Sequence, residues 1–221
     1  MQQYNLDKMR AVWRVQNNIH HDSVATSLSI VNRADQVEIN IFDIIGVNDT
    51  DVSSFIESVN AASGKPINLN INSPGGFYFD ALTMYDVLNT SKSTVNVSIR
   101  ALAASAATVI AMAGDSVTIA ESGRMMIHDV QGLVGGSPAE IREYADLTDN
   151  LSNDLSKIYA KRGKHSAVAF RNAMKKETWY SSQQAVDVGL VDRVSSKGNK
   201  GPDNRTRIIQ ARYSALMGGL K

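Results

Sequence analysis

The sequence predicts an α/β fold in which helices wrap a mainly parallel sheet. From Gln36 onward, stretches with the two-residue alternation of strands take turns with stretches that carry apolar residues at helical spacing. This repeated alternation favours parallel strands joined by helical crossovers. The chain has 221 residues, of which 43% are hydrophobic and 20% charged, and this is ordinary usage for one globular domain.

The expected elements follow one another in a regular order along the chain. The longest helix begins at Ser137-Pro138-Ala139-Glu140, which has a capping-box pattern with proline at the first helical position. The expected strands cover residues 36–42, 66–72, 94–100, 116–120, 124–128 and 190–194. The expected helices cover residues 51–62, 79–89, 104–113, 138–162, 165–174 and 183–189.

Composition divides the chain into three expected segments. Residues 1–35 are polar with weak periodicity, and we expect an irregular arm that has room for one strand. Residues 36–194 form the expected domain, and residues 195–221 form a basic tail. From Arg193 to Lys221 there are seven basic residues and one acid, a local charge of +6. This composition is equally compatible with two alternatives for the tail: a short helix that docks on a partner, or a solvated segment without a contact.

Several classes of function are disfavoured by composition. The net charge is +1 and aromatic residues make up 6%, so we expect no binding of nucleic acid. There is no cysteine, and the four histidines lack the spacing of a metal site, so we expect no metal and no cofactor. The most apolar stretch, residues 101–113, is too short to span a membrane, and no signal peptide is visible. We therefore expect a cytoplasmic protein.

Three features point to covalent catalysis when they are taken together. Ser73-Pro74-Gly75-Gly76 follows a strand, and its glycines could turn peptide N–H groups toward a developing oxyanion. Ser105 lies where a strand gives way to a helix, next to unpaired N–H groups that begin at Ala106. His128 closes a strand, and histidine is the usual base for a serine nucleophile. Each feature alone would be explained by turn formation or packing.

Five motifs, in order, resemble the Clp protease proteolytic subunit (ClpP) family. They are INSPGG (71–76), MYDVL (84–88), ALAASAATVIAMAG (101–114), RMMIHD (124–129) and ETWYSSQQAVDVGLVD (177–192). The resemblance covers residues 36–194 and is strongest to the phage and prophage branch of head-maturation (prohead) proteases. It implies a ClpP/crotonase-like spiral of βαβ units with a long protruding helix.

The resemblance also implies roles for individual residues. Ser105 matches the family's nucleophile and His128 its general base, although Ala101 stands where the family has the glycine that opens its G-x-A-A-S motif. Gly76 and Ala106 match the two oxyanion-hole donors. The segment from Gln131 to Ser137 matches the region that pairs with substrate and makes contacts between rings.

The family's catalytic triad also contains an acid that supports the histidine, and this is the residue that the sequence specifies least. Counting back from GLVD places the family's aspartate on Glu177, and a glutamate can fill this role. The competing explanation is a surface glutamate paired with Lys175 or Lys176. Asp129 should leave its strand on the opposite face, and Asn172 lies off the family position.

The leading hypothesis is therefore a ClpP-like serine endopeptidase that forms a homo-oligomer, a heptameric ring or double ring. Its polypeptide substrate would be a capsid, scaffold or portal protein in phage or prophage head maturation. One alternative is a catalytically weak or inactive ring-forming assembly protein, and another is a housekeeping protease that works with an ATP-dependent unfoldase. An acyl-CoA enzyme on the crotonase-like spiral is a further alternative, but it would place an acid at the reacting carbon in place of the Ser/His pair.

Overall fold

A computed structural model describes residues 6–16, 28–47 and 49–195. Eight strands of this part form a single sheet with the order β1-β2-β3-β4-β5-β8, and β6 pairs with both β4 and β7. The pairs from β2 to β5, β5 with β8, and β4 with β6 are parallel, whereas β1 and β7 are antiparallel to their neighbours. The prediction of an α/β protein with a mainly parallel sheet is confirmed. The strands are β1 (Leu28–Asn32), β2 (Val37–Phe42), β3 (Ile67–Ser73), β4 (Val95–Ala104), β5 (Ser116–Ala120), β6 (Arg124–Ile127), β7 (Thr178–Ser181) and β8 (Arg193–Ser195).

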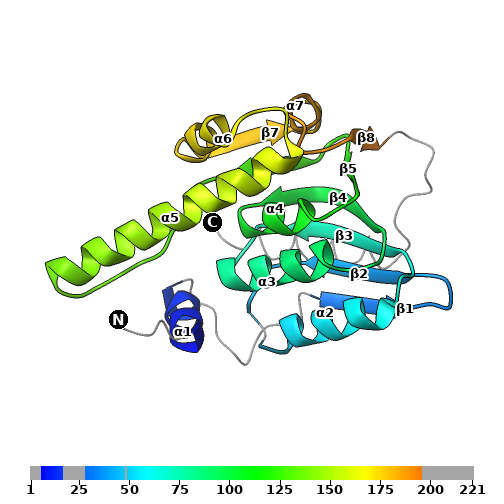
Figure 1. The fold of residues 1–221 in the computed structure, drawn as a ribbon, viewed down its shortest axis with the longest axis horizontal. Coiled ribbons are helices and arrows are strands. Elements are labelled where there is room, and N and C mark those ends of the chain that lie inside the picture. The colour runs from blue at the N-terminus through cyan, green and yellow to red at the C-terminus, as the bar shows by residue number, and fades with distance from the viewer. Residues whose placement is uncertain (1–5, 17–27, 48, 196–221) are drawn as a thin grey trace, which may run out of the picture.

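Helices α2, α3 and α4 lie on one side of the sheet, and the longest helix extends well beyond it (Figure 1). This long helix, α5, starts with the capping box that its sequence predicts, because Ser137 and Glu140 bond each other's backbone N–H groups. Helices α2, α3 and α4 each join two neighbouring parallel strands as crossovers of the βαβ kind, whereas α6 lies between β6 and β7, which are antiparallel. The helices are α1 (Leu6–Gln16), α2 (Asp49–Ala62), α3 (Tyr78–Asn89), α4 (Ala106–Ala111), α5 (Pro138–Arg162), α6 (Ala167–Met174) and α7 (Ser182–Asp187).

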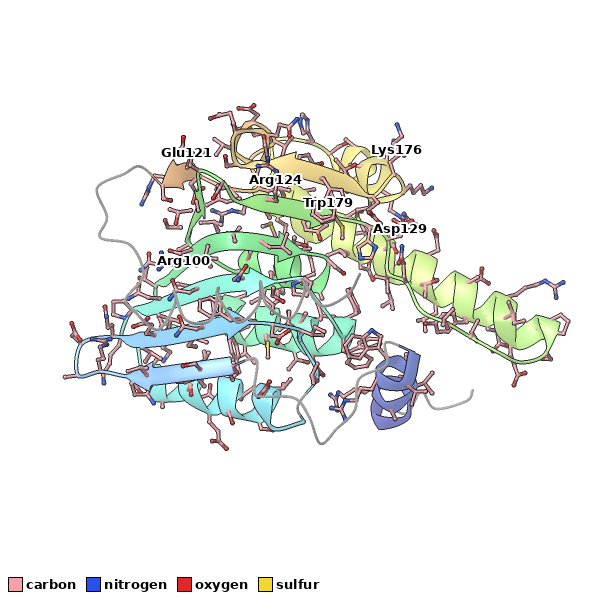
Figure 2. All side chains as sticks on the ribbon, turned by 180° about the vertical axis from the view of Figure 1, so that it is seen from behind. Arg100, Glu121, Arg124, Asp129, Lys176 and Trp179 are labelled. Carbon is pink, nitrogen blue, oxygen red and sulfur yellow. The ribbon has the colours of Figure 1, made fainter. Side chains whose placement is uncertain are left out.

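The core lies between the sheet and its helices. Strands β2 and β4 bury alternate residues, so one face packs under α2, α3 and α4 while the other carries polar side chains. On that polar face the Asn70 side chain donates to Asn40 Oδ1 at 2.8 Å and accepts from Arg100. Arg100 is labelled on this face in Figure 2. No helix that the structure describes is both long and apolar enough to cross a membrane.

Some local expectations differ from the structure. The strand expected at 94–100 continues to Ala104, so α4 begins only at Ala106. The last strand, expected at 190–194, is β8 at residues 193–195. Strand β7 was not expected, and it exists because it pairs with β6 in antiparallel register. Within the expected irregular arm, residues 6–16 form the helix α1, which was not expected, whereas β1 is the one strand for which the arm had room. Apart from Ser195, the basic tail lies outside the described residues.

Helix α1 packs beside the start of α3. Arg10 Nη2 lies 2.5 Å from Asp80 Oδ1, and the Arg10 guanidinium stacks 5.3 Å from the centre of the Phe77 ring. Arg14 donates to the carbonyl oxygen of Gly46. Because Phe77 directly follows the Gly75-Gly76 turn, α1 supports the segment that leads out of this turn.

Candidate active site

Ser105 occupies a sharp turn between the end of β4 and the start of α4. Its backbone has φ 52° and ψ −126°, a conformation that is sparsely populated by residues other than glycine. The Ser105 N–H donates to the carbonyl oxygen of Met126 in the neighbouring strand at 2.9 Å. The residues after Ser105 are small and buried, so the chain can turn tightly into α4. This turn holds Ser105 at the carboxyl end of β4, a central strand of the sheet.

His128 directly follows β6 and reaches Ser105. The His128 Nε2 lies 2.6 Å from the Ser105 Oγ, within hydrogen-bonding distance. The pairing of β4 with β6 brings the two residues together, because Ala104 and Met126 are register partners. A serine hydroxyl bonded to an imidazole nitrogen is the arrangement that activates a serine nucleophile.

The surroundings of His128 favour its neutral form. Burial lowers the pKa of the imidazole below its ordinary value, and this effect outweighs the negative charges of Glu177 and Asp129, which raise the pKa. The Nδ1 atom is buried and has no hydrogen-bond partner in the part of the chain that the structure describes. A neutral imidazole can accept a proton at Nε2, so His128 is prepared to act as a base.

The glycine turn lies directly against Ser105. The Ser73 Oγ donates to the carbonyl oxygen of Asp43 at 2.6 Å and accepts from the Gly75 N–H at 3.1 Å. A Cβ built on Gly75 would lie 2.8 Å from the Ala106 nitrogen, so the two segments touch. Within the described residues, neither the Gly76 N–H nor the Ala106 N–H makes a hydrogen bond. The Ala106 amide directly follows the serine, and the Gly76 amide belongs to the turn that packs against it, so both are candidate donors to an oxyanion.

The three residues considered as the acid that supports His128 have different surroundings in the structure. The Glu177 Oε1 accepts from the Trp179 Nε1 at 3.2 Å, so Glu177 acts on His128 through its charge and not through a hydrogen bond. Glu177 makes no ion pair with a lysine within the described residues, and its φ is 47°. Asn172 is exposed on α6. Asp129 bonds to Arg171.

One contributor to the site was not anticipated from the sequence. Arg171 binds Asp129, the residue that follows the base. The position of Arg171 carries no local signal, because its partners lie 18 to 42 residues away in the chain. Among the described residues no group of three acidic or histidine side chains could hold a metal ion.

Comparison with known protein families agrees with this geometry. A family model described as Clp protease matches residues 27–198. The matched span contains all eight strands, the turn at Ser105 and the adjoining His128. Clp proteases are serine peptidases that generally form ring oligomers and act on polypeptides. The chain belongs to the Clp protease family.

Proposed function

We propose that this protein is a serine endopeptidase with Ser105 as its nucleophile and His128 as its general base. The observation that carries the proposal is the 2.6 Å contact between His128 Nε2 and Ser105 Oγ, at a strained turn against which the glycine turn packs. The lowered pKa of His128 supports the role of a base, since the imidazole stays neutral near pH 7.

In the proposed reaction, His128 Nε2 takes the hydroxyl proton as Ser105 Oγ attacks the carbonyl carbon of the scissile peptide bond. The Gly76 and Ala106 N–H groups donate to the tetrahedral oxyanion. The C–N bond then breaks, and His128 passes its proton to the leaving amine. Water attacks the acyl-enzyme ester with His128 again as base, which releases the acid and restores the serine.

Glu177 is proposed as the third member of the site. Its negative charge raises the pKa of His128, so it stabilises the imidazolium that forms during the reaction. Its Oε1 accepts from Trp179 at 3.2 Å, and a direct bond to His128 Nδ1 would require the carboxylate to move. The unpartnered Nδ1 provides a place for such a bond.

A homo-oligomer, a heptameric ring or double ring, is proposed as the working form. Two features on the projecting part of the molecule support assembly. The long helix α5 extends past the sheet, as Figure 1 shows. The apolar side chains of Val134 and Ile141 are 40% and 43% exposed and line one groove together with Tyr144. The polypeptide substrate is proposed to be a capsid, scaffold or portal protein in phage or prophage head maturation. The support for this is the resemblance of the sequence motifs to that branch.

The proposal is tested by labelling with a fluorophosphonate probe, which reacts covalently with activated serines. We expect the native protein to be labelled at Ser105 and the Ser105→Ala protein to stay unlabelled. Incubation with purified capsid, scaffold and portal proteins, with and without an ATP-dependent unfoldase, then distinguishes head maturation from housekeeping proteolysis. Equal labelling of both proteins, or labelling of neither, contradicts the proposed nucleophile.

A catalytically weak assembly protein is the second candidate. The observation in its favour is that His128 Nδ1 is unpartnered while Glu177 is bonded to Trp179. This candidate predicts ring formation without labelling of Ser105, so the same probe separates the two.

A further inference from the structure

A buried arginine joins three separate segments behind the site. The Arg171 side chain, on α6, is 9% exposed. Its Nη1 donates to Asp129 Oδ1, its Nη2 to Asp149 Oδ1 at 2.5 Å, and its Nε to Asn153 Oδ1 at 3.1 Å. The planar guanidinium presents donors in fixed directions, and here three of its nitrogens are used at once. It therefore ties α5 and α6 to the residue that follows His128.

The backbone after His128 has a second anchor, at Val130. The Val130 N–H donates to the Ser152 Oγ at 2.9 Å, and Ser152 belongs to α5. On the near side of His128, strand β6 holds the chain through its pairing with β4 and β7. Since His128 Nδ1 has no hydrogen-bond partner among the described residues, these backbone anchors and the bond of Nε2 to Ser105 set the direction of the imidazole.

Resting on the proposed function, we infer that Arg171 is a positioning residue that aims His128 at Ser105 by holding Asp129, and that it screens the imidazole from the Asp129 carboxylate. Asp129 lies where the long helix meets the sheet (Figure 2). Arg171 reaches it from α6, and Asp149 accepts from the other terminal nitrogen of the guanidinium.

The charges around His128 make the screening measurable. Asp129 is adjacent in the chain, and Glu177 comes from the connection between α6 and β7; both raise the pKa of the imidazole. The neighbour at the start of α4 is the uncharged Ser105. Behind Asp129 stand Arg171 from α6 and Asp149 from α5, and Lys175 and Lys176 after α6 are exposed. Because an arginine bonded to a carboxylate offsets its charge, loss of either partner should change the field at His128 in opposite directions.

The experiment is an NMR titration of His128 in full-length protein labelled at histidine Cε1. The chain has four histidines, so His128→Gln assigns the signal. Arg171→Gln removes the positive charge that offsets the Asp129 carboxylate, and we expect the pKa of His128 to rise by about 0.5 to 1 unit. Asp129→Asn leaves the guanidinium positive, and we expect a fall of about the same size. In the double variant the two changes should cancel, to within about 0.3 unit of the parent.

Arg162→Gln is the matched control. Arg162 is also a largely buried arginine, with its side chain 15% exposed, and it bonds to Asp192 at 2.6 Å in another part of the molecule. Its loss should disturb packing to a similar degree and leave the pKa of His128 unchanged. If Arg171→Gln does not fold, Asp129→Asn still has to lower the pKa, and Arg171→Lys has to keep it near the parent value.

The inference is overturned if Arg171→Gln and Asp129→Asn shift the pKa in the same direction, or if neither moves it. The titration does not depend on peptide hydrolysis, so it separates this inference from the proposed function. Persistence of activity in Ser105→Ala would remove the proposed function and leave the titration result standing. If the protein is active, the midpoint of the acidic limb of its pH–rate profile should follow the pKa of His128. This midpoint should lie at higher pH in Arg171→Gln than in Asp129→Asn.

Discussion

Gly75 lies so close to Ser105 that no side chain fits between them. A Cβ on Gly75 would come within 2.8 Å of the Ser105 Cβ and 2.6 Å of the Ala104 carbonyl oxygen, and the φ of Gly75 is +98°. The glycine turn and the serine turn therefore pack backbone against backbone. This contact sets the distance between the serine hydroxyl and the amides of the glycine turn.

We expect Gly75→Ala to abolish hydrolysis, because the added methyl group must push the two turns apart. The control is Gly64→Ala, where φ is +88° and no atom lies within 4 Å of the new Cβ. Both changes carry the strain of a positive φ, on the order of 1–2 kcal/mol, but only the first adds a collision. Peptidase rates and thermal unfolding of the two proteins measure the difference. Equal activity in both would show that the contact is unimportant for catalysis.

The rate of hydrolysis should depend on pH through His128. A base must be neutral to accept a proton, so activity is lost as pH falls through the pKa of the imidazole. Burial lowers this pKa, so the acidic limb of kcat/KM should have its midpoint below the ordinary value of about 6.5. Rates measured from about pH 4.5 to 9 with a neutral peptide substrate locate the midpoint. A midpoint clearly above that value would exclude His128 as the base in this environment.

Glu177→Gln should lower kcat sharply, by up to about 10⁴-fold if Glu177 behaves as a triad acid. The glutamine keeps an oxygen that can accept from Trp179 and removes the charge that stabilises the imidazolium. Glu177→Asp keeps the charge and shortens the reach, so a moderate loss is expected. Steady-state kinetics measures all the variants.

Two variants serve as controls for the glutamate. Asn172→Ala should be nearly silent, because Asn172 is exposed on α6. Trp179→Phe removes the indole N–H together with the five-membered ring, and because Trp179 is 51% exposed this costs little packing. Since Glu177→Gln keeps an acceptor for Trp179, an equal loss of activity in Trp179→Phe would show that the indole bond holds the Glu177 carboxylate in place. A collapse of activity in Asn172→Ala beside an unchanged Glu177→Gln would move the third role to the asparagine.

In solution the protein should have a mass several times the 24.0 kDa of one chain. Ile141→Glu places a charge in the apolar groove that Ile141 and Tyr144 of α5 form with Val134 of the preceding segment, and it should shift the mass toward the monomer. Glu143→Lys also changes the charge of an exposed residue on α5 but leaves the groove intact, and serves as the control. Light scattering at micromolar concentration measures both. A parent protein that is already monomeric would contradict the proposed ring.

A buried hydrogen bond connects α4 to α5. The Tyr159 hydroxyl lies 2.6 Å from the Thr108 Oγ1, which also bonds to the Ser105 carbonyl oxygen. Tyr159→Phe should lower the free energy of unfolding by about 0.5–1.5 kcal/mol, the usual net value of one hydrogen bond. Thr108→Val should cost more, because the Tyr159 hydroxyl and the Ser105 carbonyl both lose a partner. Chemical denaturation provides the comparison, and equal stability of Thr108→Val and the parent would contradict it.

The elements that could be predicted from the sequence are those with a strong local pattern. Strand β2 was expected at 36–42 and helix α2 at 51–62, and both lie within two residues of those bounds. The start of α5 was predicted to the residue, because a capping box acts between groups three residues apart. Strand β7 lacks such a pattern. It has four residues with little alternation, and only its pairing with β6 makes it a strand.

The candidate site divides in the same way. The serine at a strand–helix junction, the histidine at a strand end and the glycine turn are visible in the sequence, because each is a local feature of a few residues. Their meeting is not local: Ser105 reaches His128 only because β6 pairs with β4. The partner of Glu177, the unpartnered Nδ1 and the bonds of Arg171 to Asp129 and Asp149 were likewise decided by the tertiary structure. Side-chain and helix-capping preferences act over a few residues, whereas strand register and buried ion pairs form only when distant segments pack together.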